Sequence, residues 1–134
     1  EVKHFITDKE QLKRATHAVT ENERTKTAVE ELNAGNVKAF GKLMNQSHIS
    51  LRDDYEVTGF ELDSLVEAAW EAKGVIGARM TGAGFGGCTV SIVEDEFIDE
   101  FIKSVGEKYK SKTGLTADFY VAKIGDGSRK LGDF

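Results

Sequence analysis

The stretch ARMTGAGFGGCTVSIV, residues 78–93, carries the strongest structural signal in this sequence. It places four glycines within six positions, and three of them, Gly82, Gly84 and Gly87, have the spacing G-x-G-x-x-G. The residues on either side, VIGARM before the glycines and CTVSIV after them, are apolar and alternating, which predicts two strands. The glycines therefore connect a strand to a strand.

This placement bears on three interpretations of the loop. A dinucleotide fingerprint needs a helix directly after the glycines, and a strand follows here, so that motif is disfavoured. A Walker P-loop needs a lysine after its last glycine, and Cys88 follows Gly87. A plain hairpin bend stays open, but it needs only one or two glycines. The surplus favours a loop that another backbone or a ligand approaches closely, with N–H groups that can form an anion nest.

Composition and charge are those of an ordinary soluble globular protein. The 134 residues fit one domain, with 40% hydrophobic and 31% charged residues. A net charge of −5 without a long Lys/Arg block argues against binding to nucleic acid or to an anionic membrane. No apolar run reaches membrane-spanning length, and the N-terminus has no export signal. Because the chain opens on Glu1 rather than methionine, we expect it to be part of a longer protein.

The single cysteine, Cys88, excludes an internal disulfide and indicates a reducing compartment, the cytoplasm. Cys88 alternates with Val90 and Ile92 in the second strand. This pattern predicts that Cys88 is a small core residue rather than a nucleophile or a metal ligand.

Helical periodicity predicts a long first helix over about 8–33, opened by the capping box at 7–10. Its middle, residues 21–27, has no apolar side chain, so this part either faces solvent, the favoured interpretation, or meets another part of a larger protein. A second helix follows, capped by Asn36, and the two form a hairpin. His48 lies on the apolar side of the second helix, and we expect a hydrogen-bonded core residue there rather than a metal ligand.

A third helix is predicted to open at the capping box 58–61 and a fourth to span about 95–112. A last strand over 118–124 leads into a polar tail that can add a short edge strand. The order from residue 75 onward is strand, strand, helix, strand. The fold class is therefore α+β, with helices packed on a mainly antiparallel sheet of three to four strands.

Several stretches of this chain resemble one known family. GARMTGAGFGGCTVSIV resembles the third sequence motif of the GHMP small-molecule kinases, in the form typical of galactokinases. Three stretches resemble segments that precede that motif in the same proteins: RATHAVTENERT (14–25), AFGKLMNQSHISLRDDYEV (39–57) and ELDSLVEAA (61–69). The resemblance covers residues 14–124 in one register, which makes it more specific than a glycine motif alone.

The resemblance implies that residues 1–134 form the C-terminal domain of a two-domain enzyme, with a ferredoxin-like plait and extra N-terminal helices. It implies transfer of the γ-phosphoryl group of ATP to the anomeric hydroxyl of α-D-galactose, with Mg²⁺ assisting, to give galactose 1-phosphate. Such transfer depends on positioning and on neutralising phosphate charge. Galactokinases carry the sugar-binding motif, the catalytic Asp and Arg and the main ATP loop in their N-terminal portion. We therefore expect no catalytic residue and no metal ligand in this chain, and no activity from it alone.

One family motif carries over residue by residue. The residues expected to pack against the sugar-binding motif and to line the cleft near the transferred phosphate are Gly82, Ala83, Gly84, Phe85, Gly86 and Gly87. Weaker candidates, which could order the cleft wall or the domain interface, are Arg52, Asp53, Asp54 and Tyr55. For this second group a structural role within the domain is the stronger interpretation.

The expected partners are the protein's own N-terminal domain, galactose and ATP, in a full-length monomer. An apolar patch around Met80 and Phe85 is predicted to be exposed, with the glycine loop less ordered than its strands. Two alternatives stay open. One is a galactokinase-like protein that senses galactose and ATP and contacts a transcriptional repressor. The other is a GHMP kinase for a different sugar, such as N-acetylgalactosamine.

Overall fold

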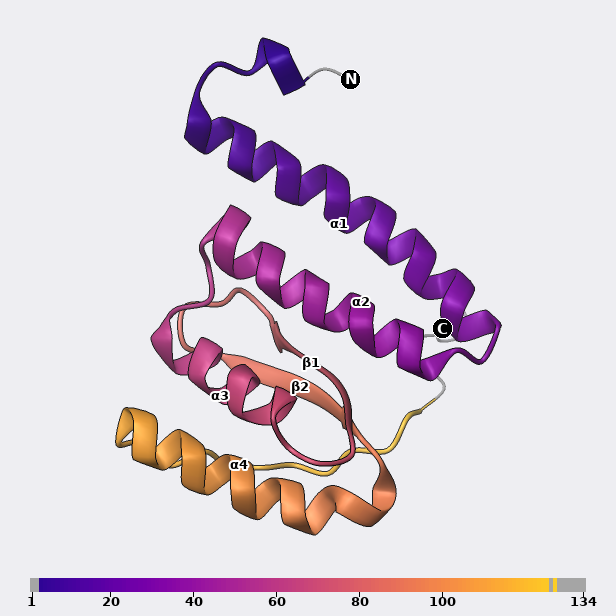
Figure 1. Ribbon diagram of the computed structural model, residues 1–134, viewed down its shortest axis with the longest axis vertical. Coiled ribbons are helices and arrows are strands. Elements are labelled where there is room, and N and C mark those ends of the chain that lie inside the picture. Colours follow the sequence, from indigo (N-terminus) through magenta and orange to yellow (C-terminus); the bar gives the residue numbers. More distant parts are fainter. Residues whose placement is uncertain (1–2, 126, 128–134) are drawn as a thin grey trace, which may run out of the picture.

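The computed structural model describes residues 3–125 and residue 127. Its elements are η1 (Lys3–Phe5), α1 (Lys9–Asn33), α2 (Val37–Ser50), η2 (Leu51–Tyr55), α3 (Phe60–Trp70), β1 (Val75–Thr81), β2 (Cys88–Val93), η3 (Asp95–Phe97) and α4 (Ile98–Thr113). Figure 1 shows α1 and α2 as an antiparallel hairpin on one side, the strands and α3 in the middle, and α4 on the other side. The helices and the first two strands lie close to their predicted positions, and the α+β class is confirmed.

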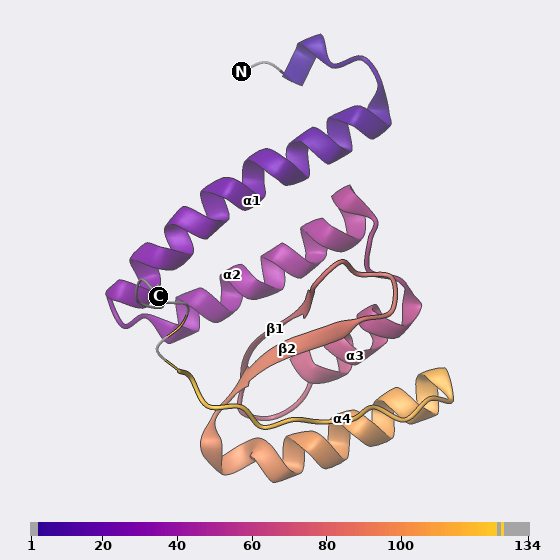
Figure 2. The ribbon, with the colours of Figure 1, turned by 180° about the vertical axis from the view of Figure 1, so that it is seen from behind.

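The two strands pair antiparallel, with Thr81 opposite Cys88 next to the loop and Val75 opposite Val93 at the far end. One face of this sheet packs on α3 and α4. The core there consists of Val66, Ala68, Ala69, Ala78, Phe101 and Val105. Figure 2, seen from behind, shows both strands in front of α3, so α3 covers only the far face of the sheet.

The residues of β2 that face the helices are not the ones that the sequence predicted. Thr89 and Ser91 face the helices, because they pair with the buried Met80 and Ala78, while Cys88 is exposed and Val90 is 44% exposed. The prediction that Cys88 is a core residue is therefore wrong in this chain. Thr89 and Ser91 lie on the face of β2 toward the helices, together with Val93, which packs against the core, while Cys88 and Val90 lie on the opposite face.

Helix α2 covers the edge of β1 that does not pair with β2. The backbone N–H of Ala78 donates to Asn45 Oδ1 at 2.8 Å, and the N–H of Met80 donates to His48 Nδ1 at 3.1 Å. These side chains take the place of a neighbouring strand, since unpaired N–H groups are costly inside a protein. The predicted role of His48 as a hydrogen-bonded core residue is confirmed.

The strand predicted over 118–124 is wrong. The described part of the sheet has two strands, and residues 118–124 run without a ladder partner. Phe119 packs edge-on against Phe101 of α4, with ring centroids 6.1 Å apart, so this segment follows the helix instead. The predicted edge strand in the tail falls largely on residues 126 and 128–134, which lie outside the described residues.

Two predicted helix caps also need correction. Asp8, not Thr7, caps α1, because its carboxylate accepts the N–H of Gln11 at 2.8 Å. At α3 the cap position is Gly59 with φ of 85°, and the Thr58 side chain is buried rather than capping. A capping-box pattern identifies a helix start but not which of two adjacent residues has the right backbone angles.

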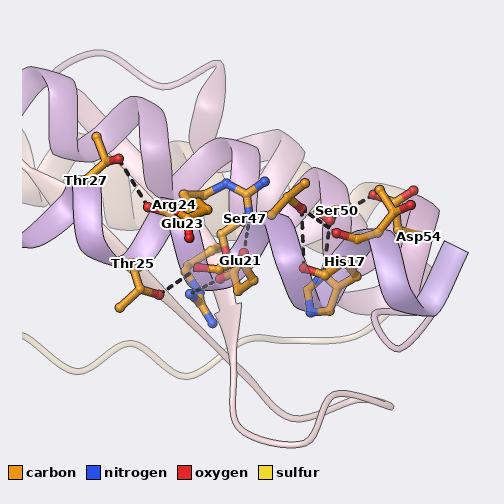
Figure 3. Close-up of polar contacts among 12 residues, drawn as sticks. His17, Glu21, Glu23, Arg24, Thr25, Thr27, Ser47, Ser50 and Asp54 are labelled. Carbon is orange, nitrogen blue, oxygen red and sulfur yellow. Dashed lines mark hydrogen bonds and ion pairs between the residues drawn. The ribbon is translucent and has the colours of Figure 1, made fainter. Parts of the chain in front are cut away.

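The interface between α1 and α2 is polar, as Figure 3 shows. His17 Nδ1 lies 3.0 Å from Ser50 Oγ, and that hydroxyl donates to Asp54 Oδ2 at 2.9 Å. One turn earlier in α2, Ser47 Oγ donates to Glu21 Oε1 at 2.5 Å. The two helices are therefore joined by hydrogen bonds as well as by packing.

The expectation that residues 21–27 face solvent is wrong in part. Glu21 and Arg24 are half-buried and paired with each other, and Glu21 also lies 3.4 Å from the Arg79 guanidinium on β1. In contrast, Val19 and Val29 on the opposite side of α1 are 65% and 55% exposed. The first helix therefore turns some of its polar side chains toward the rest of the chain and leaves these two valines exposed.

We expect protonation of His48 to destabilise the fold. Burial lowers the pKa of His48 from its ordinary value of 6.5, against the opposing effect of Asp63, whose Oδ1 lies 3.2 Å from Nε2. The unfolded state then binds more protons below about pH 6.5, so the stabilisation present above that pH is lost as the pH falls. Urea unfolding should show a loss of stability between pH 7 and pH 5 that the His48→Gln variant lacks. Parallel pH profiles for the two proteins would contradict this assignment.

Candidate functional site

The candidate site is the loop between β1 and β2, residues 82–87. Three of its glycines have left-handed backbone angles, with φ of 81° at Gly82, 86° at Gly84 and 94° at Gly86. Phe85 shares this conformation, with φ of 57°. Residues with a β-carbon seldom adopt such angles, so the path of the loop explains three of the four glycines.

The loop is fixed at its centre by Val57, which follows η2. The N–H of Phe85 donates to the carbonyl oxygen of Val57 at 2.8 Å. A β-carbon at Gly84 would lie 2.0 Å from that same oxygen, so no larger residue fits there. Close approach of another backbone, which the surplus of glycines suggested, is therefore found at Gly84.

The remaining glycines of the loop are not explained by contacts within the chain. Among residues 3–125, a β-carbon at Gly82 or Gly86 would meet nothing within 4 Å, and one at Gly87 would have ordinary contacts of 3.7 and 3.8 Å. Gly87 does not have a left-handed backbone either. Neither packing nor backbone angle among the described residues requires glycine at position 87.

The weaker candidates lie in η2, a π-helical turn that leads to Val57 and so to the loop. Arg52 Nε lies 2.8 Å from Asp53 Oδ1, and its guanidinium lies 3.6 Å from Glu67 of α3. The hydrogen bond to Arg52 lowers the pKa of Asp53 and raises that of Arg52. Both groups therefore stay charged and paired at neutral pH.

The other two members of this group contact α1 and α2. Asp54 accepts the Ser50 hydroxyl through its side chain, and its backbone oxygen accepts Arg14 Nη1 at 2.6 Å. The Tyr55 ring stacks on His17, with centroids 4.7 Å apart. All four residues thus make structural contacts that hold η2, and with it Val57, beneath the glycine loop.

The described residues do not fit a magnesium site. No group of three or more His, Cys, Asp or Glu side chains within them could hold a metal ion. Asp53 is paired with Arg52, and Asp54 is hydrogen-bonded to Ser50. No step that depends on a metal can therefore be assigned to this part of the chain.

The predicted apolar patch around the loop is half correct. Phe85 is 77% exposed, as expected, but Met80 is 1% exposed and packs with Leu51 and Leu62. The cause is again the strand alternation, since Met80 lies on the face that α3 covers. Among the described helices, none is long and apolar enough to cross a membrane.

A surface groove lies away from the loop, between α3 and α4. Two ion pairs bridge it, Lys108 to Glu71 at 3.0 Å and Lys112 to Glu67 at 2.7 Å. Because its charges are paired across the groove, it offers no free cations to a phosphate.

Sequence reasoning missed Val57 and Asn45, which support the loop and the strand before it. Val57 has no signal in the sequence, because it contributes a backbone oxygen and any residue could do so. Asn45 and His48 are polar residues on the face of α2 that meets β1, and each accepts a hydrogen bond from that strand. Of these two, the sequence singled out only His48, and the hydrophobic periodicity did not show that its partner is β1.

Comparison with known proteins places this arrangement in a family. Residues 28–111 match the family described as GHMP kinases, C terminal. A galactokinase of Fusobacterium nucleatum is 74% identical over 130 residues, which cover 97% of this chain and 33% of that protein. A galactokinase of Clostridium acetobutylicum is 61% identical over 131 residues, 98% of this chain and 34% of that protein.

A solved structure agrees with these relatives. The crystal structure of Lactococcus lactis galactokinase complexed with galactose has a TM-score of 0.88 and 56% identity, covering 94% of this chain and 32% of that one. This chain therefore spans about a third of the length of the relatives it matches. The family match includes both η2 and the glycine loop and extends over more than half of the chain. The chain belongs to the GHMP kinase family, whose C-terminal domain it matches.

Proposed function

We propose that this chain is the C-terminal domain of a galactokinase, which transfers the γ-phosphoryl group of ATP to the anomeric hydroxyl of α-D-galactose. The observation that carries the proposal is identity of 61–74% to proteins named galactokinase along almost the whole chain. The galactose bound in the Lactococcus lactis structure supports this choice of sugar. The protein is proposed to act in the cytoplasm as a monomer, with Mg²⁺ held by the preceding domain.

Within this function, the loop is proposed to line the cleft between the two domains, near the transferred phosphate. Three observations support this role. The loop is bonded to Val57, and it is exposed. Among the described residues an added β-carbon would also meet nothing within 4 Å at Gly82 or Gly86, and only ordinary contacts at Gly87. A fixed loop with glycine at most of its positions can bring backbone N–H groups close to an anion at little reorganisation cost.

Position 87 offers a sharp test of the cleft role. The Gly87→Ala variant should fold normally, because the added methyl group meets only ordinary contacts in this chain. In the full-length enzyme we expect kcat/KM for galactose phosphorylation to fall about tenfold or more, since about 1.4 kcal/mol of lost transition-state stabilisation gives that factor. The measurement is steady-state kinetics with ATP and galactose, together with the melting temperature.

Gly125→Ala is the matched control, because Gly125 also lacks a left-handed backbone and none of the described residues lies within 4 Å of an added β-carbon. It should leave both kinetics and melting temperature unchanged. Wild-type kinetics for Gly87→Ala would reject the cleft role of the loop while leaving the galactokinase proposal intact.

The wild-type full-length protein tests the function itself. Formation of galactose 1-phosphate from ATP and galactose supports the kinase. Binding of both ligands without turnover would instead indicate a sensor, and turnover with N-acetylgalactosamine in preference to galactose would indicate a kinase for another sugar.

A further inference from the structure

Phe85 has a backbone conformation that is unfavourable for a residue with a β-carbon. It lies in the left-handed region, as do Gly84 and Gly86 on either side. The one other described residue with a β-carbon in this region is Glu56, whose side chain lies 3.1 Å from Lys13 and 2.7 Å from Arg14. The side chain of Glu56 therefore has a structural role that offsets the disfavoured backbone.

The Phe85 side chain has no comparable role within the described chain. It is 77% exposed and belongs to neither cluster of the core. An exposed aromatic ring on a strained backbone is unfavourable on both counts, because glycine would relieve the strain and a polar side chain would suit water. A favourable contact between the Phe85 ring and a part of the protein beyond these residues would explain why phenylalanine occupies this position.

The backbone holds this ring in a defined place. The N–H of Phe85 is bonded to Val57, and the close packing of Gly84 against the same carbonyl fixes the residue before it. The ring is therefore presented from a fixed point of the hairpin.

The residues around Phe85 indicate the kind of surface that its ring contacts. The 14 residues from Met80 to Val93 contain no charged side chain, although 31% of the whole chain is charged. Cys88 and Val90 in this stretch are also exposed. The charged residue beside this exposed surface is Arg79, which lies opposite Val90 and is paired with Glu21. Exposed aromatic and uncharged side chains, with no unpaired charge among them, fit the centre of a protein interface, where charged residues are depleted and aromatic ones enriched.

We propose that Phe85 is a positioning residue that anchors the hairpin in an apolar pocket on the preceding domain of the full-length protein. The occupant is argued from length, since the relatives are about three times as long as this chain. Because the pocket holds the Phe85 ring, the preceding domain fixes the position of the glycine loop relative to the cleft. This inference rests on the proposed function for its second domain, but not on the identity of the sugar.

The test uses Phe85→Gly in the full-length protein, because this change removes the ring and also relieves the backbone strain. Hydrogen exchange of residues 81–90 without ligands is the main measurement, and kcat and KM are the second. We expect exchange in the hairpin to become at least about tenfold faster, as loss of a buried phenylalanine worth about 1.5 kcal/mol or more implies. We expect kcat to fall while the Phe85→Leu variant restores most of it.

Phe60→Ala is the matched control, since Phe60 is another exposed phenylalanine, on the first turn of α3, and should change neither measurement. Unchanged hairpin exchange in Phe85→Gly would overturn the proposal. So would a rise in KM for ATP or galactose with unchanged exchange, because this would place Phe85 on the ligand instead. The exchange measurement needs no turnover, so an inactive wild-type protein would reject the proposed function without deciding this inference.

Discussion

Replacing Gly41 by alanine is expected to destabilise the fold by about 3 kcal/mol or more, although alanine is the better helix former. Gly41 lies inside α2, where the change alone would stabilise the helix by about 1 kcal/mol. The added β-carbon, however, would lie 2.1 Å from the carbonyl oxygen of Ile76 on β1. Because the obstacle is backbone, α2 must move away from the strand, and the bonds from Asn45 and His48 to β1 would lengthen with it.

Urea unfolding of the variant and the wild type measures this effect. Gly106→Ala is the matched control, because Gly106 is also helical and an added β-carbon would lie 3.4 Å from the movable ring of Phe119. This control should be stabilising by up to about 1 kcal/mol. Equal gains at both positions would show that α2 and β1 are not in the close contact described above.

Gly84→Ala is the second change with a large expected effect. It adds a β-carbon 2.0 Å from the Val57 oxygen at a position with φ of 86°, so steric overlap and backbone strain act together. We expect a loss of about 3 kcal/mol or more and rupture of the hydrogen bond from Phe85 to Val57. Urea unfolding gives the energy, and faster exchange of the Phe85 amide reports the broken bond.

Gly82→Ala separates the two causes, because Gly82 has a similar φ of 81° but the part of the chain that the structure describes has no atom within 4 Å of the added carbon. It should cost only the strain, about 1–2 kcal/mol. If Gly82→Ala and Gly84→Ala were equally destabilising, the contact with Val57 would contribute nothing.

The sequence was a good guide to the elements but not to the direction in which they face. Helix periods and glycine positions located four helices and the hairpin, because these signals are local. The alternation of β2 is also local, yet it cannot tell which face meets the core, so Cys88 was assigned to the wrong side. The strand predicted over 118–124 has the right pattern, but a strand needs a partner, and the described residues supply none.

The candidate site could also be predicted from the sequence only in part. The number and spacing of the glycines indicated close approach, and the structure finds it at Gly84. The group that approaches is a backbone oxygen of Val57, 27 residues earlier in the chain, and no side-chain pattern can reveal such a contact. In the proposed two-domain protein, the exposed apolar side chains of α1 and β2 would pack on the preceding domain, and such surfaces look misplaced when one domain is viewed alone.

The covering of β1 by α2 has a consequence for aggregation. A bare strand edge is a template on which a second molecule can add its own strand, and such additions lead to fibrils. On β1 the outward N–H groups of Ala78 and Met80 are already taken by Asn45 and His48, and Gly41 and Gly77 bring α2 too close for a strand to enter. Intermolecular strand addition at β1 therefore requires α2 to detach first, so damage to the contact at Gly41 should increase the tendency of this protein to polymerise.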